Sequence, residues 1–322
     1  MTLQITQEIR KNIADTFREI ASFDVSLKKI SRWKIGGIAQ VVITPQSINE
    51  LQNVFAKINE WRLPYIVIAG TSNLLFDSKG LDAIAIQIGP SLSKITIQDT
   101  EIIAEAGLWV PCLARKAMQK SLTGLEHICG IPGTLGGLVY MNGGSQRKGI
   151  ASAVQFVETI DSTGRLKRYN YKDCKFSYRD SVFQNKNEII VRVGLKLNKA
   201  RRKQAIHHEM LNILKERTSK FPRRLPNCGS TFLGNPDMYA EYGPPGKVIE
   251  ECGFKGFKIG GAVVAQEHAN FINNIDEATS NDVLETISKI QDCVYKKTGY
   301  LMNVEARFVM VKGVICKIGE SF

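Results

Sequence analysis

The sequence lacks apolar runs long enough to cross a membrane, and it has few residues of the kinds that bind structural metals. Its seven cysteines form no CxxC pair, and neither they nor the four histidines have metal-ligand spacing. The first twenty residues lack the unbroken apolar segment of a secretory signal and instead have the spacing of an amphipathic helix. We therefore expect a cytoplasmic protein with reduced thiols, no bound metal and no membrane partner.

Acidic residues are also in deficit: 31 Asp and Glu stand against 43 Lys and Arg, a formal net charge of +12. Such a balance attracts anionic partners. The basic residues are spread along the chain, apart from "ARRK" (Ala200 to Lys203) and "FPRR" (ending at Arg224), and no known nucleic-acid-binding module surrounds them. We expect no nucleic-acid partner, because small polyanions such as nucleotides suit this charge at least as well.

The chain of 322 residues is long enough for two or three domains. A helix that starts after Ser47 lies between expected strands at 39–45 and 64–70, in a βαβ-like unit. Shorter strands at 82–88, 94–107, 153–170 and 188–198 surround a helix at 110–121. A charged helix at 199–222 marks a domain boundary, and the last part has a helix capped by Ser280 and a strand at 303–313. This order predicts an α+β fold.

Two glycine-bearing turns stand out. "IAGTSNLLF" (Ile68 to Phe76) follows an expected strand, and "GIPGTLGGLVYMNGG" (Gly130 to Gly144) has six glycines in fifteen residues and no charge. Glycine lets a ligand approach the main chain, and consecutive amides can point at a phosphate. The turns can therefore bind a pyrophosphate, or they can be tight turns with close packing. Neither matches the dinucleotide-binding or phosphate-loop fingerprint, so a Rossmann domain and a P-loop enzyme are disfavoured.

Seven stretches, read in order, resemble the successive signatures of the UDP-N-acetylenolpyruvoylglucosamine reductase family. They are "WKIGGIA" (from Trp33), "IAGTSNLLF", "GLEHICGIPGTLGGLVYMNGG", "FSYRDSVF", "NCGSTF", "GPPGKVIEECGFKG" and "KIGGAVVAQEHANFI". The resemblance runs from Trp33 to Phe308. It implies a vanillyl-alcohol-oxidase/PCMH-type FAD-binding fold of two α+β subdomains, 1–86 with the first helix and 87–200, and a carboxy-terminal α+β substrate domain, 201–322.

The same resemblance implies that the glycine turns bind FAD and that NADPH is the reductant. No histidine lies in the Trp33 or Thr71 turns, so we expect the FAD to be non-covalent. The implied cofactor-binding residues are Gly36, Gly37, Gly70, Thr71, Ser72, Asn73, Leu74, Gly130, Ile131, Pro132, Gly133, Thr134, Gly136, Gly137, Asn142 and Gly143.

The family reaction is the NADPH-dependent reduction of UDP-N-acetylglucosamine-enolpyruvate to UDP-N-acetylmuramate, a precursor of peptidoglycan. Hydride arrives at C3, so the site needs a charged group for the developing enolate and a proton donor for C2. The resemblance implies that Arg179 binds the carboxylate and enolate, that Ser230 donates the proton, and that Glu305 acts beside the enol. Taken alone, these residues also fit a surface ion pair, a turn or helix cap, and a solvated strand face.

Tyr178 and Asn235 are the implied substrate-binding residues. "FLGNP" departs from the usual "FKNP", so the family lysine is missing there or is replaced by Lys247, Arg223 or Arg224. His127 replaces an aromatic residue, and it is either a packed ring or a titratable group near the flavin. The chain has no obvious insertion between Tyr178 and Ser230, which resembles the shorter subclass that lacks a substrate-covering loop. We expect a monomer.

Two other functions stay open. An oxidoreductase of the same fold with another nucleotide sugar as its substrate would keep many of these residues. A catalytically silent nucleotide or nucleic-acid binder would account for the net charge, and it would bind nucleic acid with a steep salt dependence and purify without flavin. The joint presence of Arg179, Ser230 and Glu305 favours the reductase.

Overall fold

The computed structural model describes residues 5–200, 202–222 and 224–319, which form two compact units. The first unit takes the chain up to Ser22 together with Val42–Gly70 and Ala85–Arg217. The second unit takes Phe23–Val41, Thr71–Ile84 and the chain from Thr218 onward. The three-domain division stays a prediction.

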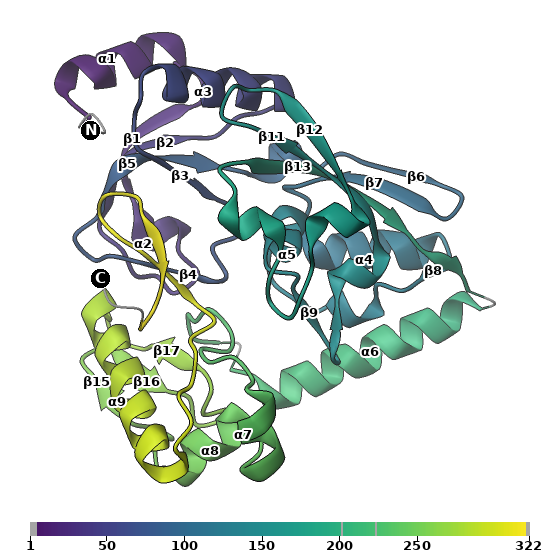
Figure 1. Cartoon of the computed structure of the whole chain (residues 1–322), viewed down its shortest axis with the longest axis vertical. Coiled ribbons are helices and arrows are strands. Elements are labelled where there is room, and N and C mark those ends of the chain that lie inside the picture. Colours follow the sequence, from purple (N-terminus) through teal and green to yellow (C-terminus); the bar gives the residue numbers. More distant parts are fainter. Residues whose placement is uncertain (1–4, 201, 223, 320–322) are drawn as a thin grey trace. The chain divides into compact units, whose positions relative to one another are not determined.

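An antiparallel five-stranded sheet in the order β12-β11-β13-β7-β6 is the main element of the first unit (Figure 1). Helix α5 packs against β13 and β7, and its residues Leu135, Leu138 and Val139 are buried. The bounds are β6 Ile95–Gln98, β7 Glu101–Glu105, β11 Val154–Ile160, β12 Leu166–Asn170, β13 Ile189–Lys196, α4 Val110–Gln119 and α5 Leu135–Tyr140.

Other elements of the first unit surround this sheet. Helix α3 begins after Ser47, whose side chain accepts a hydrogen bond from the amide of Glu50 at 3.1 Å, and this confirms the predicted cap. Two short pairs, β9 with β10 and β14 with β8, complete the unit. The bounds are α1 Gln7–Thr16, α3 Ile48–Glu60, β3 Tyr65–Ile68, β8 Leu122–Thr123, β9 Gly144–Ser145, β10 Lys148–Gly149 and β14 Asn198–Lys199. Helix α6, Lys203–Lys220, begins in the first unit, and its last three residues belong to the second.

A four-stranded sheet has the order β1-β2-β5-β3. Strands β2 Ile38–Ile43 and β5 Leu81–Gln87 are rich in buried aliphatic residues, as the apolar runs predict, whereas β1 Ala21–Ser26 has no fully buried residue. Short 3-10 helices lie at Pro90–Leu92, Glu126–Ile128, Ile150–Ala153, Tyr171–Cys174 and Val182–Asn185.

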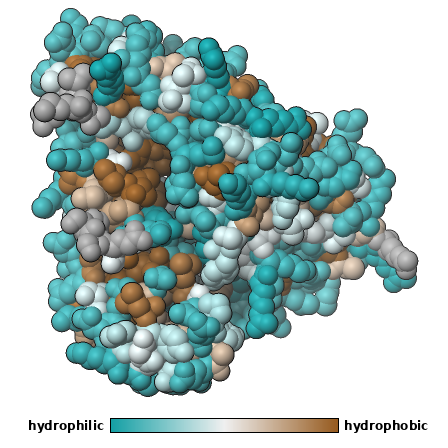
Figure 2. Space-filling view, viewed as in Figure 1, coloured by the Kyte–Doolittle hydropathy of each residue, from teal (hydrophilic) through white to brown (hydrophobic). Residues whose placement is uncertain are grey.

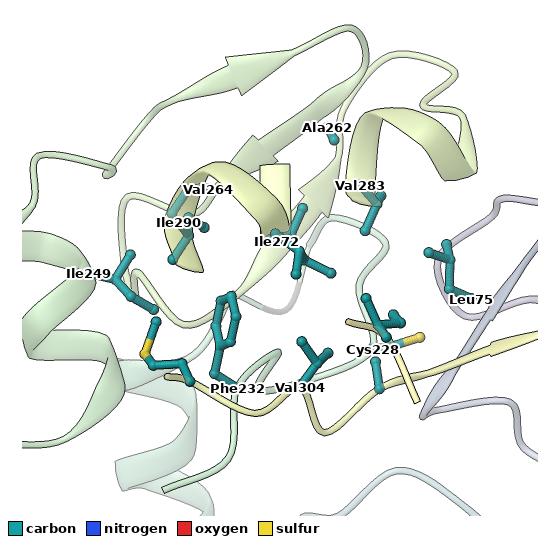
Figure 3. Close-up of a cluster of buried hydrophobic side chains, with 14 of the residues drawn as sticks. Leu75, Cys228, Phe232, Ile249, Ala262, Val264, Ile272, Val283, Ile290 and Val304 are labelled. Atoms are coloured by element: carbon teal, nitrogen blue, oxygen red, sulfur yellow. The ribbon is translucent and has the colours of Figure 1, made fainter. Parts of the chain in front are cut away.

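The second unit is built on two three-stranded sheets, β15-β16-β17 and β19-β18-β4. Its hydrophobic core, drawn in Figure 3, brings together Phe232, Val304, Ile272 and Ile290 from segments far apart in the sequence. Strand β4 pairs in parallel with β18, with Leu74 opposite Arg307. The bounds are α2 Leu27–Ile30, β4 Leu74–Phe76, α7 Pro236–Glu241, α8 Pro245–Glu251, β15 Lys258–Ile259, β16 Ala262–Val264, β17 Ile272–Asn274, α9 Ser280–Thr298, β18 Arg307–Val309 and β19 Ile315–Lys317.

Helix α9 begins one residue earlier than the predicted cap implies. Thr279, not Ser280, is the cap, and its side chain and that of Asp282 bond each other's backbone amides at 3.2 and 2.8 Å. Ser280 is instead buried, and its amide donates to Ser78 Oγ at 2.8 Å. The prediction was wrong because both residues favour the cap position, and the buried contact with Ser78 is visible only in the fold.

Removal of this cap gives a first testable prediction. We expect Thr279→Ala to lower the free energy of unfolding by about 1 kcal/mol, since the amide of Asp282 loses its partner. Urea denaturation of this variant, compared with the exposed α9 substitution Ser288→Ala, measures the difference. Equal midpoints for the two variants would contradict the capping role.

The surface in Figure 2 is mostly hydrophilic on the visible face, with hydrophobic residues gathered in separate patches. No helix within the described ranges combines the length and apolar character needed to span a membrane. The mixture of helices and largely antiparallel sheets confirms the predicted α+β class.

Candidate active site

The two glycine turns meet through their backbones in the first unit. A Cβ placed on Gly70 would lie 3.2 Å from Gly133 Cα and 3.6 Å from the amide nitrogen of Thr134. Gly133 itself has φ +150°, a conformation that favours glycine, and its carbonyl accepts from Val110 N at 3.0 Å. The contact leaves bare main chain from two distant segments side by side, which is the kind of surface that a flat ring or a diphosphate can lie against.

Packing explains other glycines of this stretch. A Cβ on Gly136 would lie 2.9 Å from Ala106 Cβ, and one on Gly143 would lie 2.7 Å from Leu138 Cδ1. Gly136 also donates its amide to the carbonyl of Ala106 at 2.8 Å, which fixes α5 against the end of β7. The close-packing interpretation therefore applies to Gly136 and Gly143, whereas Gly137 is exposed and has only Thr134 Oγ1 within reach, at 3.5 Å.

Asn142 connects the end of α5 to the turn that contains Arg179. Its Nδ2 donates to the carbonyl of Ser177 at 2.7 Å, and its Oδ1 accepts from the amide of Ala151 at 3.1 Å. Its backbone is in the left-handed region, at φ +41°. Both ends of the side-chain amide thus hold protein segments in place.

Arg179 occupies the corner of a tight turn. Ser177 and Asp180 exchange backbone hydrogen bonds of 3.1 and 3.2 Å across it, and Arg179 has φ +55°, which is uncommon for a residue with a side chain. Gln184 Nε2 donates to the Arg179 carbonyl at 3.0 Å, and Arg179 Nη2 donates to the carbonyl of Gly144 at 3.2 Å. Strained backbone of this kind is concentrated at functional sites, where the surrounding structure maintains it.

Tyr178 precedes Arg179 in the same turn and is 66% exposed. The Arg179 guanidinium carbon lies 5.5 Å from the centre of the Tyr178 ring, within the range of a cation–π contact. The predicted substrate-binding tyrosine and the predicted catalytic arginine therefore lie next to each other, with the ring open to solvent.

The glycines of the "WKIGG" turn are closely packed within the second unit. A Cβ on Gly36 would lie 2.6 Å from Leu27 Cβ, and one on Gly37 would lie 2.6 Å from Ser78 O and Gly80 N. The sequence did not distinguish this packing role from contact with a ligand.

The "GTSNL" turn runs beside the segment that contains Glu305, just before β18. Asn73 Nδ2 donates to the Glu305 carbonyl at 3.0 Å, and Arg307 donates its amide to the Asn73 carbonyl at 2.9 Å. Thr71 is buried, and its hydroxyl accepts from Arg32 N at 3.1 Å and donates to Ile30 O at 3.0 Å. Predicted cofactor and catalytic residues are therefore adjacent here.

Ser230 begins a segment that pairs with the segment around Glu305. Phe232 and Val304 form an antiparallel bridge, and Glu305 donates its amide to the carbonyl of Thr231 at 2.8 Å. Ser230 and Glu305 are both half-buried, whereas the alternate residues Val304, Ala306 and Phe308 are buried, as the strand pattern predicts. The structure thus brings Ser230, Glu305 and Asn73 together within the second unit.

Cys228 lies two residues before Ser230 and is packed inside the core. Its thiol contacts the carbonyls of Thr71 and Leu74 at 3.5 and 3.6 Å. Burial raises the pKa of this thiol to about 12, so it is protonated and unreactive as a nucleophile at neutral pH.

The residues predicted near the diphosphate have structural roles of their own. Asn235 caps α7, because its Oδ1 accepts from the amides of Asp237 and Met238 at 2.9 and 3.2 Å. Lys247 lies 3.6 Å from Glu251, Arg224 is exposed, and Arg223 lies outside the described residues.

His127 is a buried ring, 4% exposed, in the 3-10 helix that precedes Gly130. Burial lowers the pKa of this imidazole, and the nearby charge of Lys148 lowers it further. Of the two interpretations left open by the sequence, the fold favours the packed, neutral ring.

Two side chains that contact these segments were not singled out from the sequence. Gln184 holds the turn of Arg179, and Asn270 bonds both backbone groups of Phe232. Asn270 lies inside the quoted motif "KIGGAVVAQEHANFI", where it follows the polar stretch Gln266 to His268 and nothing in the sequence sets it apart.

Residues 39–170 match the family described as FAD binding domain, and residues 221–309 match the carboxy-terminal domain of UDP-N-acetylenolpyruvoylglucosamine reductase. UDP-N-acetylenolpyruvoylglucosamine reductase 1 of Corynebacterium glutamicum is 41% identical over 310 residues, covering 96% of this chain and 92% of that protein. The reductase of Caldanaerobacter subterraneus is 36% identical over 88% of this chain and 91% of its own length.

A solved structure agrees with these matches. The crystal structure of the Thermus caldophilus reductase superposes with a TM-score of 0.74 at 30% identity, over 88% of this chain and 97% of that one. The resemblance drawn from the seven sequence stretches is confirmed across the FAD-binding and carboxy-terminal domains. The chain belongs to the UDP-N-acetylenolpyruvoylglucosamine reductase family.

Proposed function

We propose that this chain reduces UDP-N-acetylglucosamine-enolpyruvate to UDP-N-acetylmuramate with NADPH as reductant and FAD as cofactor, in the synthesis of peptidoglycan precursors. The observation that carries the proposal is the 41% identity, over 96% of the chain, to a protein of that name. We also propose a monomer of the shorter, loop-lacking subclass that acts in the cytoplasm.

FAD fits the residues of the glycine turns. A side chain on Gly70 would intrude on the Gly133 main chain, Gly133 has φ +150°, and Gly137 is exposed near the start of α5. We assign the remaining predicted cofactor residues in the Thr71 and Gly130 turns to the same site, with no covalent bond to the chain. FAD, when bound, supplies the two-electron step between NADPH and the substrate.

The substrate requires charge stabilisation and a proton. The fixed fork of Arg179 suits the carboxylate and the negative charge that develops at the adjoining carbon. Ser230 donates a proton to C2, and because a serine is a weak acid it acts only on a strongly basic enolate. We assign to Glu305 the hydrogen bond to the enol; its half-buried position and its backbone bond to Thr231 support this role.

For the uridine diphosphate we retain Tyr178 and Asn235, with Lys247 or Arg224 as the source of positive charge. Tyr178 is supported by its exposure beside Arg179. Asn235 already caps α7, and the lysine expected before it is absent, so this part of the site differs from the family pattern. That difference favours, as a second candidate, an oxidoreductase of the same fold for another nucleotide sugar.

An anaerobic absorbance experiment tests the function. Addition of NADPH to the purified holoenzyme is expected to bleach the flavin, and addition of UDP-N-acetylglucosamine-enolpyruvate is expected to restore its colour. Bleaching without recovery would favour the second candidate. A protein that is colourless and cannot be reconstituted with FAD would overturn both.

The contact between the glycine turns gives a further prediction. We expect Gly70→Ala to weaken FAD binding about tenfold, which is about 1.4 kcal/mol, because the added methyl group must displace the Gly133 main chain. Titration of the apoprotein with FAD, followed by flavin fluorescence, measures the affinity. Gly89→Ala is the matched control, since its methyl would meet only Thr44 Cγ2, at an ordinary 3.6 Å. Wild-type affinity in both variants would contradict the assignment.

A further inference from the structure

The side chain of Asn270 clamps the backbone of Phe232. Asn270 is only 6% exposed, in the loop between β16 and β17. Its Oδ1 accepts from the Phe232 amide at 2.8 Å, and its Nδ2 donates to the Phe232 carbonyl at 3.0 Å. A single side-chain amide thereby satisfies both main-chain groups of one residue, as a neighbouring strand would.

The main chain of Asn270 adds a third bond to the same segment. Thr231 donates its amide to the Asn270 carbonyl at 2.8 Å. In the other direction, the Thr231 carbonyl accepts from Glu305 N and the Leu233 amide donates to Asn303 O, both at 2.8 Å. The segment that follows Ser230 is therefore held between Asn270 and the segment from Asn303 to Glu305.

Asn270 is itself held in place. Its amide donates to His268 Nδ1 at 3.2 Å, and the rings of His268 and Phe271 lie against Phe221 with centroids 5.4 and 5.1 Å away. The Phe232 and Val304 side chains, whose backbones form the antiparallel bridge, lie next to each other in the core, as Figure 3 shows. The clamp is thus rigid at both ends.

We propose that Asn270 is a positioning residue for protonation of the substrate: it fixes the backbone after Ser230 and so sets the place of the Ser230 hydroxyl relative to Glu305. This inference rests on the proposed role of Ser230 as proton donor. Proton transfer requires the donor within hydrogen-bond distance of the receiving carbon, and a displacement of about 1 Å can cost about 100-fold in rate. Because Thr231 and Phe232 directly follow Ser230, the position of their backbone sets the distance between the Ser230 hydroxyl and the receiving carbon.

The test compares two substitutions in the holoenzyme. Asn270→Ala removes both side-chain bonds, and we expect reoxidation of the reduced flavin by the enolpyruvyl substrate to slow about 100-fold. Reduction by NADPH should stay within about twofold of wild type, since it does not use the Ser230 proton. Hydrogen exchange of the Phe232 amide should rise, which reports the loss of the clamp independently of the cofactor.

Asn270→Asp provides a pH readout that simple loss of packing does not give. When protonated, the carboxyl group introduced by this substitution can accept from Phe232 N and donate to Phe232 O, whereas the carboxylate cannot donate. The rate of reoxidation should therefore recover as pH falls in Asn270→Asp and not in Asn270→Ala. His268 contacts Asn270, and Glu305 bonds the Thr231 carbonyl, and both side chains are titratable. The rate of each variant is therefore divided by the wild-type rate at the same pH, which removes their contribution to the pH dependence.

Asn59→Asp is the matched control. Asn59 is half-buried on α3 of the first unit, and its Nδ2 donates to the Phe55 carbonyl at 2.7 Å. It should lose stability while its reoxidation rate stays near wild type. If Asn270→Ala does not fold, the pH dependence of reoxidation in Asn270→Asp alone tests the positioning role. If the Asn270 variants reoxidise at the wild-type rate while Ser230→Ala reoxidises slowly, this inference is wrong and the proposed function stands. If Ser230→Ala itself reoxidises at the wild-type rate, the role of Ser230 is wrong.

Discussion

Ser230→Ala should accept electrons from NADPH at nearly the wild-type rate and should then return them to the enolpyruvyl substrate between about 100-fold and 10,000-fold more slowly. The lower and upper figures are the usual range for loss of a general acid. The two steps separate because only the second needs a proton at C2. The side chain of Ser230 is half-buried and contributes no core packing, so the variant should fold normally.

Stopped-flow absorbance of each half-reaction measures the two rates separately. Ser288→Ala, an exposed serine on α9 of the same unit, is the control and should match wild type in both. Equal slowing of both half-reactions by Ser230→Ala would remove the residue from its assigned role and point to a general effect on the flavin.

Arg179→Met should show the other large effect. Loss of a preorganised positive charge at the developing enolate is expected to lower kcat for substrate reduction by about 100-fold to 1,000-fold. Arg179→Lys should recover only part of this loss, since an ammonium group keeps the charge but cannot form the two parallel bonds of a guanidinium. Stability should change by only about 1 kcal/mol, because water can replace the hydrogen bond from Arg179 Nη2 to Gly144 O.

Steady-state kinetics with varied enolpyruvyl substrate, at saturating NADPH, measures kcat and the KM for that substrate. Arg165→Met provides the control, because Arg165 is exposed in the turn between β11 and β12. An unchanged kcat in Arg179→Met, with only a higher KM, would limit Arg179 to ground-state binding of the carboxylate.

Secondary-structure elements could be predicted from the sequence more accurately than contacts between distant segments. The helix after Ser47 and the alternation around Glu305 follow from short-range spacing, so both are confirmed in the fold. The cap of α9 was wrong by one residue, because the contact between Ser280 and Ser78 joins segments far apart in the chain. For the same reason the sequence did not reveal the clamp of Asn270 on Phe232, which depends on a loop placed by β16 and β17.

The glycines show the same limit at the candidate site. The sequence predicted one role, cofactor binding, for all of these glycines, but in the fold their surroundings differ. Gly36, Gly37 and Gly136 are required by neighbouring atoms at 2.6 to 2.9 Å, whereas Gly70 and Gly133 bring two turns together. Only atomic surroundings distinguish a glycine that makes room for protein from one that makes room for a ligand.

The pairing of β4 with β18 determines when the second unit can be completed during synthesis. Asn73 and Glu305 are 232 residues apart, and the parallel edge of β4 has no partner until β18 has left the ribosome. Throughout most of translation the nascent chain therefore presents an unpaired strand with buried residues Leu75 and Phe76 exposed, a target for chaperones and for aggregation. A chain that ends shortly before residue 307 would have all five strands of the sheet in its first unit but an incomplete core in its second.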